Sequence, residues 1–198
     1  MKIKWITLLG LLVHAWMAFG QGTFQYDQQS SLGPVPPDVL WSIQGNEPSG
    51  QSFIPSLSAV GFVQLELFDG NPNNGLGATL YVNLRSNSIT GPILSSSAPV
   101  FLPDTPSGGG VTNFLFSSPA VVMPGTTYFF EVVVQSGDSW YVNTLGNVYP
   151  GGEFYRQGLA QPLSDSWFRE GVIIPEPSAA WLVLAVGAVR FYVRRKTH

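Results

Sequence analysis

Short β-prone segments separated by turn-forming residues are the feature that most constrains the fold of this chain. Residues 60–68 (VGFVQLELF) and 79–86 (TLYVNLRS) alternate apolar and polar side chains, as strands with one buried face do. The linker at 69–77 (DGNPNNGLG) consists almost entirely of residues that favour turns. The two segments therefore form either an antiparallel hairpin or two neighbouring strands across a sandwich. The apolar side chains expected to face the core are Val63, Leu65, Leu67, Leu80, Val82 and Leu84.

The same pattern continues along the chain between residues 51 and 172. The strongest strand candidate is 127–134 (TYFFEVVV), whose nearly continuous apolar character indicates a central position in a sheet. Further short candidates lie at 93–97, 112–117, 140–143, 153–155 and 167–172. Strands of this length without helical periodicity predict an all-β domain at 51–172, an antiparallel β-sandwich or jelly roll. Residues 21–50 contain four prolines and are expected to form a loosely ordered lead-in.

The first 20 residues have the organisation of a secretory signal peptide, with an expected N-terminal signal helix. Lys2 and Lys4 supply the positive start, an apolar stretch follows, and small residues precede the junction between Gly20 and Gln21. The apolar run is shorter than the ~20 residues that a membrane-spanning helix needs. We therefore expect cleavage between Gly20 and Gln21, in preference to an uncleaved anchor.

The last residues of the chain combine three parts in a fixed order. These are Pro175, Glu176 and Pro177, then an apolar segment at 179–193, then Arg194, Arg195 and Lys196. The apolar segment predicts a single transmembrane helix. Arg190 interrupts the segment, but it lies near the end, where its side chain can extend to the lipid headgroups. The basic tail is expected to stop the helix in the membrane and to stay on the cytoplasmic side. A buried C-terminal helix would explain neither the prolines nor this tail.

This order of motif, apolar segment and basic tail resembles the PEP-CTERM protein-sorting signal, over residues 173–198. The resemblance implies that the partner of the chain is an exosortase, a membrane-embedded protease or transpeptidase that cuts near Pro-Glu-Pro. It also implies export across the inner membrane of an exopolysaccharide-producing bacterium as a precursor anchored by one span. The processed protein would then reach the envelope surface or the extracellular matrix. In addition, the chain has Gln-Ser-Phe at 51–53, Gly-Pro-x-Leu at 91–94, Pro-Gly-Thr-Thr-Tyr at 124–128 and Tyr-Pro-Gly-Gly at 149–152. With these landmarks, residues 51–171 resemble a β-sandwich module of secreted bacterial proteins.

Charge is distributed unevenly along the chain. Between residues 21 and 174 there are three arginines, no lysine and eleven acidic residues, a net charge of −8. Nucleic-acid binding requires a basic surface, so nucleic acid is not an expected partner. The chain has no cysteine, which excludes disulfides and thiolate metal sites, and the fold must therefore rest on its core.

The exported region lacks most of the side chains that enzymes use for catalysis. The two histidines, His14 and His198, lie in the targeting segments, and the region contains neither cysteine nor lysine. Catalytic triads, histidine zinc sites and Schiff-base chemistry are therefore excluded. A pair of carboxylates is still sufficient for glycan cleavage. The acids available for it include Glu66, Glu131, Asp138, Glu153 and Asp165.

The loop that begins at Asp69 carries oxygen-bearing side chains at alternate positions, a pattern that suits calcium. Asp69, Asn71 and Asn73 supply these side chains, and Asn74 adds another. The EF-hand pattern fails in two places, because its glycine comes one position late and a leucine replaces the final glutamate. Turn formation is the preferred interpretation, so we expect neither a metal site nor a cofactor.

Aromatic residues are frequent toward the C-terminal half of the exported region. Most are expected to fill the core, as large rings do in a small sandwich. Trp140 follows a Ser-Gly-Asp-Ser turn and Tyr149 precedes a Pro-Gly-Gly turn. These two rings are therefore the ones expected to be exposed, and they are the candidate glycan contacts.

Three functional hypotheses follow from these patterns. The preferred one is a non-catalytic, exported cell-surface or extracellular-matrix protein that an exosortase processes. The second is a carbohydrate-binding module of the exopolysaccharide matrix, which would use Trp140 or Tyr149. The third is a carboxylate-dependent enzyme that cleaves glycans.

Overall fold

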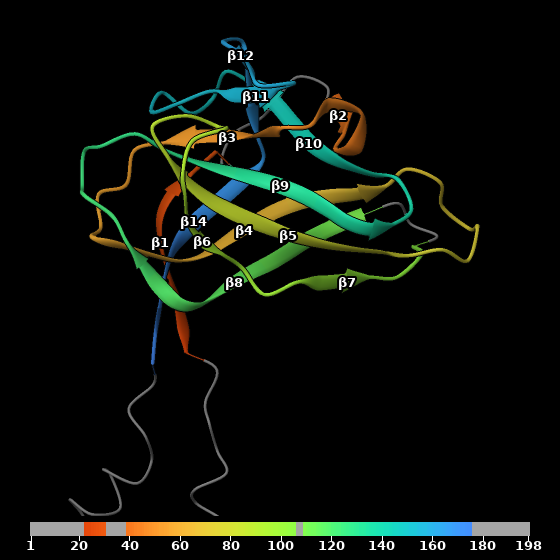
Figure 1. Cartoon of the computed structure of the whole chain (residues 1–198), viewed down its shortest axis with the longest axis horizontal. Helices are drawn as coiled ribbons and strands as arrows, with labels where there is room; N and C mark the ends of the chain where they lie inside the picture. Colours follow the sequence, from red (N-terminus) through yellow and green to blue (C-terminus); the bar gives the residue numbers. More distant parts are fainter. Residues whose placement is uncertain (1–21, 31–38, 106–108, 176–198) are drawn as a thin grey trace, which may run out of the picture. The chain divides into compact units, whose positions relative to one another are not determined.

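The computed structural model describes residues 22–30, 39–105 and 109–175. Two antiparallel sheets face each other as a β-sandwich (Figure 1). The sandwich is formed by residues 25–172, whereas residues 22–24 and 173–175 belong to a separate compact unit. The all-β architecture that the alternating segments predict is therefore confirmed.

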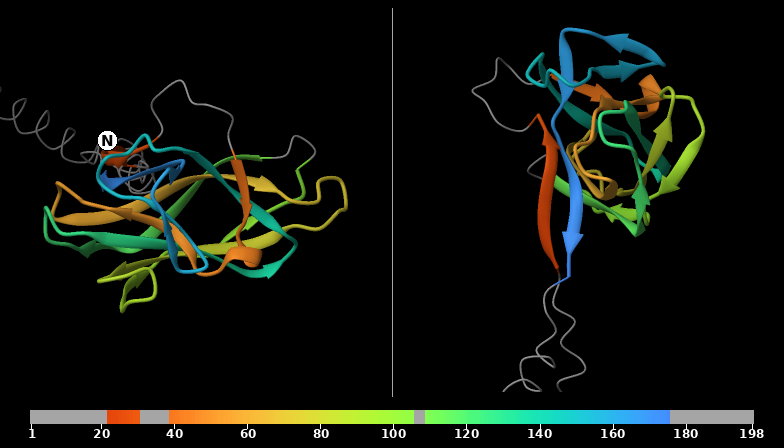
Figure 2. Two further views of the ribbon diagram at one scale, coloured as in Figure 1. Left: turned by 90° about the horizontal axis from the view of Figure 1, so that it is seen from above. Right: turned by 90° about the vertical axis from the view of Figure 1, so that its left-hand side faces the viewer.

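Sheet A is organised around one long strand, β4. Its strands run in the order β1 (Thr23–Gln29), β14 (Phe168–Ile174), β4 (Ala59–Asp69), β10 (Trp140–Gly146) and β13 (Ser164–Ser166), with β2 (Val39–Ser42) also paired to β10 and β8 (Gly109–Val121) to β4. β8 pairs along one edge of β4, and β14 and β10 share the other edge. Figure 2 shows β1 in red beside β14 in blue.

Sheet B has β9 at its centre. Its strands run in the order β12 (Leu159–Gln161), β11 (Phe154–Arg156), β3 (Ser49–Phe53), β9 (Tyr128–Gly137), β5 (Ala78–Ser86) and β6 (Ile93–Ser96), with β7 (Val100–Leu102) also paired to β5. The nearly continuous apolar run at 127–134 thus forms the central strand that its sequence predicts. It lies between β3 and β5.

The core lies between the two sheets and is formed by alternate residues of their strands. From β4 it includes Val63, Leu65 and Leu67, and from β5 Leu80, Val82 and Leu84, all fully buried. These six side chains are the ones that the alternating pattern assigns to the interior. β4 and β5 are not a hairpin, since β4 belongs to sheet A and β5 to sheet B.

The prediction of a loosely ordered lead-in at 21–50 is wrong for the part of it that the structure describes. β1 and β2 pair within sheet A, and a short 3₁₀ helix, η1 (Gln44–Asn46), connects β2 to β3. β1 (TFQYDQQ) is mostly polar and β2 has only four residues, so neither carries a clear apolar alternation. The proline-rich stretch at 31–38 lies outside the described residues.

In the part of the chain that the structure describes, no helix is long and apolar enough to span a membrane. The predicted signal helix at 1–20 and the predicted transmembrane helix at 179–193 both lie outside the described residues.

Candidate functional site

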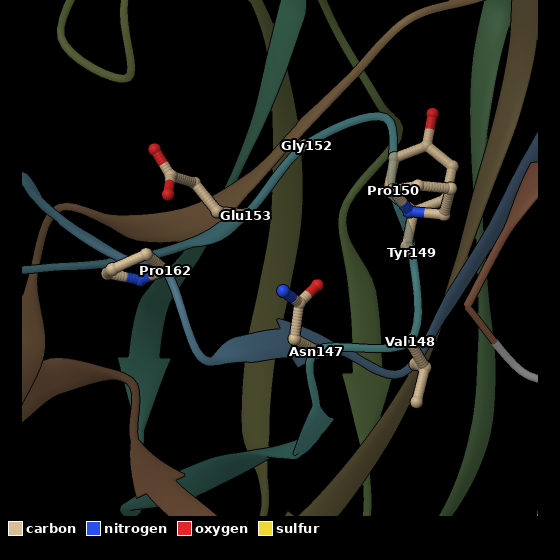
Figure 3. Close-up of a pocket in the computed structure, with 7 residues that line it drawn as sticks. All are labelled: Asn147, Val148, Tyr149, Pro150, Gly152, Glu153 and Pro162. Atoms are coloured by element: carbon tan, nitrogen blue, oxygen red, sulfur yellow. The ribbon is translucent and has the colours of Figure 1, made fainter.

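The loop between β10 and β11 borders an open pocket of about 560 Å³. The residues that line it are Asn147, Val148, Tyr149, Pro150, Gly152, Glu153 and, from the turn between β12 and β13, Pro162. Figure 3 shows the loop arching from Asn147 to Glu153, with the amide of Asn147 directed into the space that the arch encloses. The Glu153 carboxylate, at the other end of the arch, is directed away from this space (Figure 3).

A buried carboxylate beneath this loop holds it in place. Asp165 in β13 is fully buried, and its Oδ2 accepts the backbone N–H groups of Val148 and Tyr149, both at 2.8 Å. Its Oδ1 accepts Gln51 Nε2 at 2.8 Å. Burial raises the pKa of Asp165 above its ordinary value, while the hydrogen bonds from Tyr149, Gln51 and Val148 oppose that rise. Asp165 is therefore a structural anchor for the pocket.

The same polar network continues from Gln51 across the sandwich to β14. Gln51 Oε1 accepts the backbone N–H of Ser166 at 2.9 Å. Ser30 Oγ donates to the carbonyl oxygen of Ser166 and accepts the backbone N–H of Phe168 at 3.0 Å. Buried polar groups with such complete pairing fix one arrangement of the strands.

Tyr149 is a core residue and not an exposed one. Its side chain is 5% exposed, and its ring meets that of Phe168 edge-on with centroids 5.2 Å apart. Its hydroxyl donates to Gln28 Oε1 at 3.1 Å and accepts the backbone N–H of Ile54 at 3.1 Å. Burial raises the pKa of Tyr149 to about 12. The prediction that this ring is available for glycan stacking is therefore wrong.

Trp140 is likewise buried. Its side chain is 2% exposed and belongs to the hydrophobic core. Its backbone N–H donates to Gln44 Oε1 at 3.1 Å, which fixes the start of β10 after the turn. The exposure predicted from its position beside a turn is wrong, because the first inward position of β10 turns the ring into the core.

Two further carboxyl groups, Asp27 and Glu170, face each other at the edge of the core. Glu170 lies two residues after the core residue Phe168 on β14, so it shares the inward face of that strand, and it is fully buried. Burial, followed by the negative charge of Asp27, raises the pKa of Glu170 to about 9. Its carboxyl group is therefore neutral at pH 7.

Asp27 keeps its charge in the same surroundings. Its oxygens accept the backbone N–H groups of Ser56 and Leu57 at 2.8 and 2.9 Å, and Ser56 Oγ also donates to it. Burial alone would raise the pKa of Asp27, but these hydrogen bonds hold it below its ordinary value. Sequence reasoning missed this pair, although the two-residue spacing between Phe168 and Glu170 was a usable signal for an inward-facing acid.

The acids considered for glycan cleavage each have separate partners. Glu66 Oε2 accepts Asn143 Nδ2 at 2.7 Å, and Glu131 forms a salt bridge with Arg85 at 2.7 Å. Asp138 accepts the side-chain amides of Asn71 and Asn74. Of the acids, Glu153 alone is among the described residues that line the pocket, and its Oε1 accepts Tyr155 Oη at 3.4 Å. The described lining of the pocket therefore includes one carboxylate, that of Glu153, and one amide, that of Asn147.

The loop considered for calcium uses its carboxylates to hold backbone groups. Asp69 Oδ1 accepts the N–H of Asn71 at 2.9 Å, as in an Asx turn. Asp104 accepts the N–H groups of Asn73 and Gly75 at 2.8 and 2.6 Å. No group of three or more histidine, cysteine or acidic side chains that could hold a metal ion occurs among the described residues. These contacts support the turn interpretation.

The residues of the two predicted targeting segments are almost all outside the described ranges. Pro175 is described, exposed, and directly follows β14. Glu176, Pro177 and the basic tail of Arg194, Arg195 and Lys196 lie outside, as do Gly20 and Gln21 at the predicted cleavage junction.

Comparison with known proteins gives no assignment, since no protein-family model matches the chain and no curated protein matches it significantly.

Proposed function

We propose that this chain is an exported, non-catalytic cell-surface or extracellular-matrix protein that an exosortase-like membrane protease processes near Pro175–Pro177. The observation that carries the proposal is the order of the last 24 residues, in which Pro-Glu-Pro precedes an apolar segment and a basic tail. The signal-peptide pattern at 1–20 supports the same route. Before processing, the precursor spans the membrane once and exposes the sandwich outside.

The position of the motif relative to the sheet supports processing at this point. Pro175 is exposed immediately after the last residue of β14. A Cβ atom on Gly22 would approach the carbonyl oxygen of Ile174 to 2.4 Å, so the described ends of the chain lie against each other. A protease that cuts at Pro175–Pro177 therefore leaves β14 and the rest of sheet A intact.

The state of the acidic residues supports a non-catalytic sandwich. Glu131, Asp138 and Asp165 are committed to hydrogen bonds or a salt bridge on different elements. Carboxylate catalysis requires two acids on either side of one scissile bond, ~5–9.5 Å apart. Among the described residues that line the pocket, Glu153 is the one acidic residue, whereas such catalysis requires two.

Intact mass of the protein isolated from the surface fraction of its host tests the proposal. We expect a chain that begins at Gln21 and ends near Pro175–Pro177. Replacing Pro175 and Pro177 together by Ala should leave a longer, membrane-bound chain. Pro162→Ala, which changes an exposed proline elsewhere, is the matched control and should leave both processed ends unchanged. A surface-fraction chain that still ends at His198 contradicts the proposal.

A further inference from the structure

The outer side of sheet A carries a group of aromatic and amide side chains that the pocket does not use. We call this group the aromatic–amide face and define it by Tyr26, Gln64, Asn113, Asn143, Trp167 and Arg169. Gln64 alternates with the core residues Val63 and Leu65, so it points away from sheet B. Asn113 and Arg169 pair with Gln64 in register on its two sides, which places all three in one row.

The aromatic part of this face is built around Arg169. The guanidinium carbon of Arg169 lies 5.3 Å from the ring centre of Tyr26 and 5.0 Å from that of Trp167. Tyr26 also meets Phe62 edge-on at 5.7 Å, and its side chain remains 43% exposed. Cation–π contacts of this kind orient both rings. The face therefore offers two rings whose orientation is set by their neighbours.

The amide part lies directly beside these rings. Gln64 Nε2 donates to Asn113 Oδ1 at 2.8 Å, and Asn143 Nδ2 donates to the carboxylate of Glu66 at 2.7 Å. The backbone N–H of Trp167 donates to the carbonyl oxygen of Asn143 at 2.9 Å, which places Asn143 next to Trp167. Polar side chains thus continue across β14, β4, β8 and β10.

Two acceptors on this face have no donor. Gln64 Oε1 and Asn143 Oδ1 lack a hydrogen-bond partner among the described residues, and their side chains are only 6% and 1% exposed. Buried polar atoms are paired in the great majority of cases, so each unpaired one requires an explanation. Both oxygens are covered in the free chain, so a ligand hydroxyl, directly or through one water molecule, can pair with them only after neighbouring side chains move aside.

The outer side of sheet B also carries amide and charged side chains, but these side chains hydrogen-bond to one another. Glu131 accepts from both Asn83 and Arg85 at 2.8 Å, and Asn83 Oδ1 accepts from Ser96 Oγ at 2.6 Å. Among the described residues, none of these four has a buried side-chain polar atom left unpaired. The unpaired acceptors therefore distinguish the aromatic–amide face from its counterpart on the other sheet.

We propose that the aromatic–amide face binds a neutral polysaccharide, with sugar rings stacked on Tyr26 and Trp167 and sugar hydroxyls bonded to the exposed amide of Asn113. Further hydroxyls reach Gln64 and Asn143 once the side chains that cover their oxygens move aside. Aromatic rings beside amides match a ligand that has apolar ring faces and many hydroxyl groups. The exported region carries a net charge of −8, so an acidic polymer is repelled. The biological setting, a matrix rich in glycans, rests on the proposed surface location.

Binding of the full chain to defined polysaccharides tests this inference. The full chain in a detergent without sugar headgroups is titrated with hydroxyethyl cellulose, galactomannan and dextran, and with alginate as the acidic comparator. We expect saturable binding to at least one neutral polymer and none to alginate. Tyr26→Ala and Trp167→Ala should each weaken binding by about three- to tenfold, and Tyr26→Phe should retain it.

Tyr81→Ala, on the outer side of sheet B, is the matched control and should bind like the unchanged chain, with equal melting temperatures showing that each variant is folded. Three results would overturn the inference. These are no binding to any neutral polymer, binding that Tyr26→Ala and Trp167→Ala leave intact, and salt-sensitive binding to alginate alone. The mass measurement of processing is independent, so failure of one proposal does not imply failure of the other.

Discussion

Asp165 Oδ2 accepts the backbone N–H of Tyr149 at 2.8 Å, so a fully buried carboxylate of β13 fixes the loop that forms the pocket. Gln51 Nε2 donates to the other oxygen of Asp165, and Gln51 Oε1 accepts the backbone N–H of Ser166, which fixes the Gln51 amide. The loop 147–153 contains a Pro-Gly-Gly turn, yet its position is determined by these contacts. The shape of the pocket is therefore a property of the core beneath it.

Replacing Asp165 by Asn should destabilise the protein despite the equal size of the side chain. If the one oxygen of the new amide still accepts the N–H groups of Val148 and Tyr149, its NH₂ group faces Gln51 Nε2, and two donors oppose each other. Gln51 cannot rotate its amide to compensate without losing the N–H of Ser166. We expect a loss of about 1–3 kcal/mol in the free energy of unfolding, measured by denaturant titration.

Asp138→Asn is the matched control for this change. Asp138 is only partly buried and accepts hydrogen bonds from Asn71, Asn74 and the Ser139 N–H near the molecular surface. We expect it to change stability by less than Asp165→Asn does. Equal effects of the two changes would contradict the anchoring role of Asp165.

Replacing Glu170 by Gln should flatten the dependence of stability on pH. The folded chain keeps Glu170 protonated up to a pKa of about 9, whereas the ordinary value is 4.5. Between these values the folded state binds more protons than the unfolded state, so this group makes stability fall as pH rises. The slope from one such group is at most about 1.4 kcal/mol per pH unit.

The measurement is the melting temperature from pH 5 to pH 9 for the unchanged chain and for Glu170→Gln. The variant should gain stability relative to the unchanged chain as pH rises, and the two should converge toward pH 5. Glu153→Gln, at the rim of the pocket, serves as the isosteric control. Parallel curves for the unchanged chain and Glu170→Gln would show that Glu170 is not a buried neutral acid.

Calcium should not stabilise the protein through the loop that begins at Asp69. The oxygens of Asp69 and Asp104 already accept backbone N–H groups of the same region. A cation would have to displace these donors. We expect equal melting temperatures with millimolar calcium and with EDTA. A rise with calcium that Asp69→Asn abolishes would instead support a metal site at this loop.

The strands with a regular pattern were predictable from the sequence, but their pairing was not. Alternation in β4 and β5 identifies the inward residues correctly, because a half-buried strand requires it. The turn residues at 69–77 fit a hairpin and a connection between two sheets equally well. β1 was missed because its residues are mostly polar, and β2 because it has only four residues. Both segments are held as strands by their pairing within sheet A.

The site was less predictable than the fold because its contacts join residues far apart in the chain. Gln51 and Asp165 are separated by 114 residues, so no local pattern links them. Trp140 and Tyr149 were expected at the surface because each adjoins a turn. A turn determines the direction of the backbone, whereas the side-chain direction depends on the strand or loop that follows.

Phe168 should be among the residues whose truncation destabilises the protein most. Its fully buried ring lies 5.3 Å from that of Phe130 and 6.5 Å from that of Phe53, and Tyr149 contacts it edge-on. With no cysteine in the chain, no disulfide can compensate for a cavity at this position. Phe168→Ala should lower the free energy of unfolding by about 3–5 kcal/mol.

The control for this change is Phe101→Ala in β7, where the ring is 65% exposed, and its expected effect is within about 0.5 kcal/mol. Because Phe168 supports the ring of Tyr149, Phe168→Ala should also increase amide hydrogen exchange at Val148 and Tyr149. Phe101→Ala should leave that exchange unchanged. Faster exchange only at residues distant from the pocket would mean that the loop depends on Asp165 alone and not on the aromatic core beneath it.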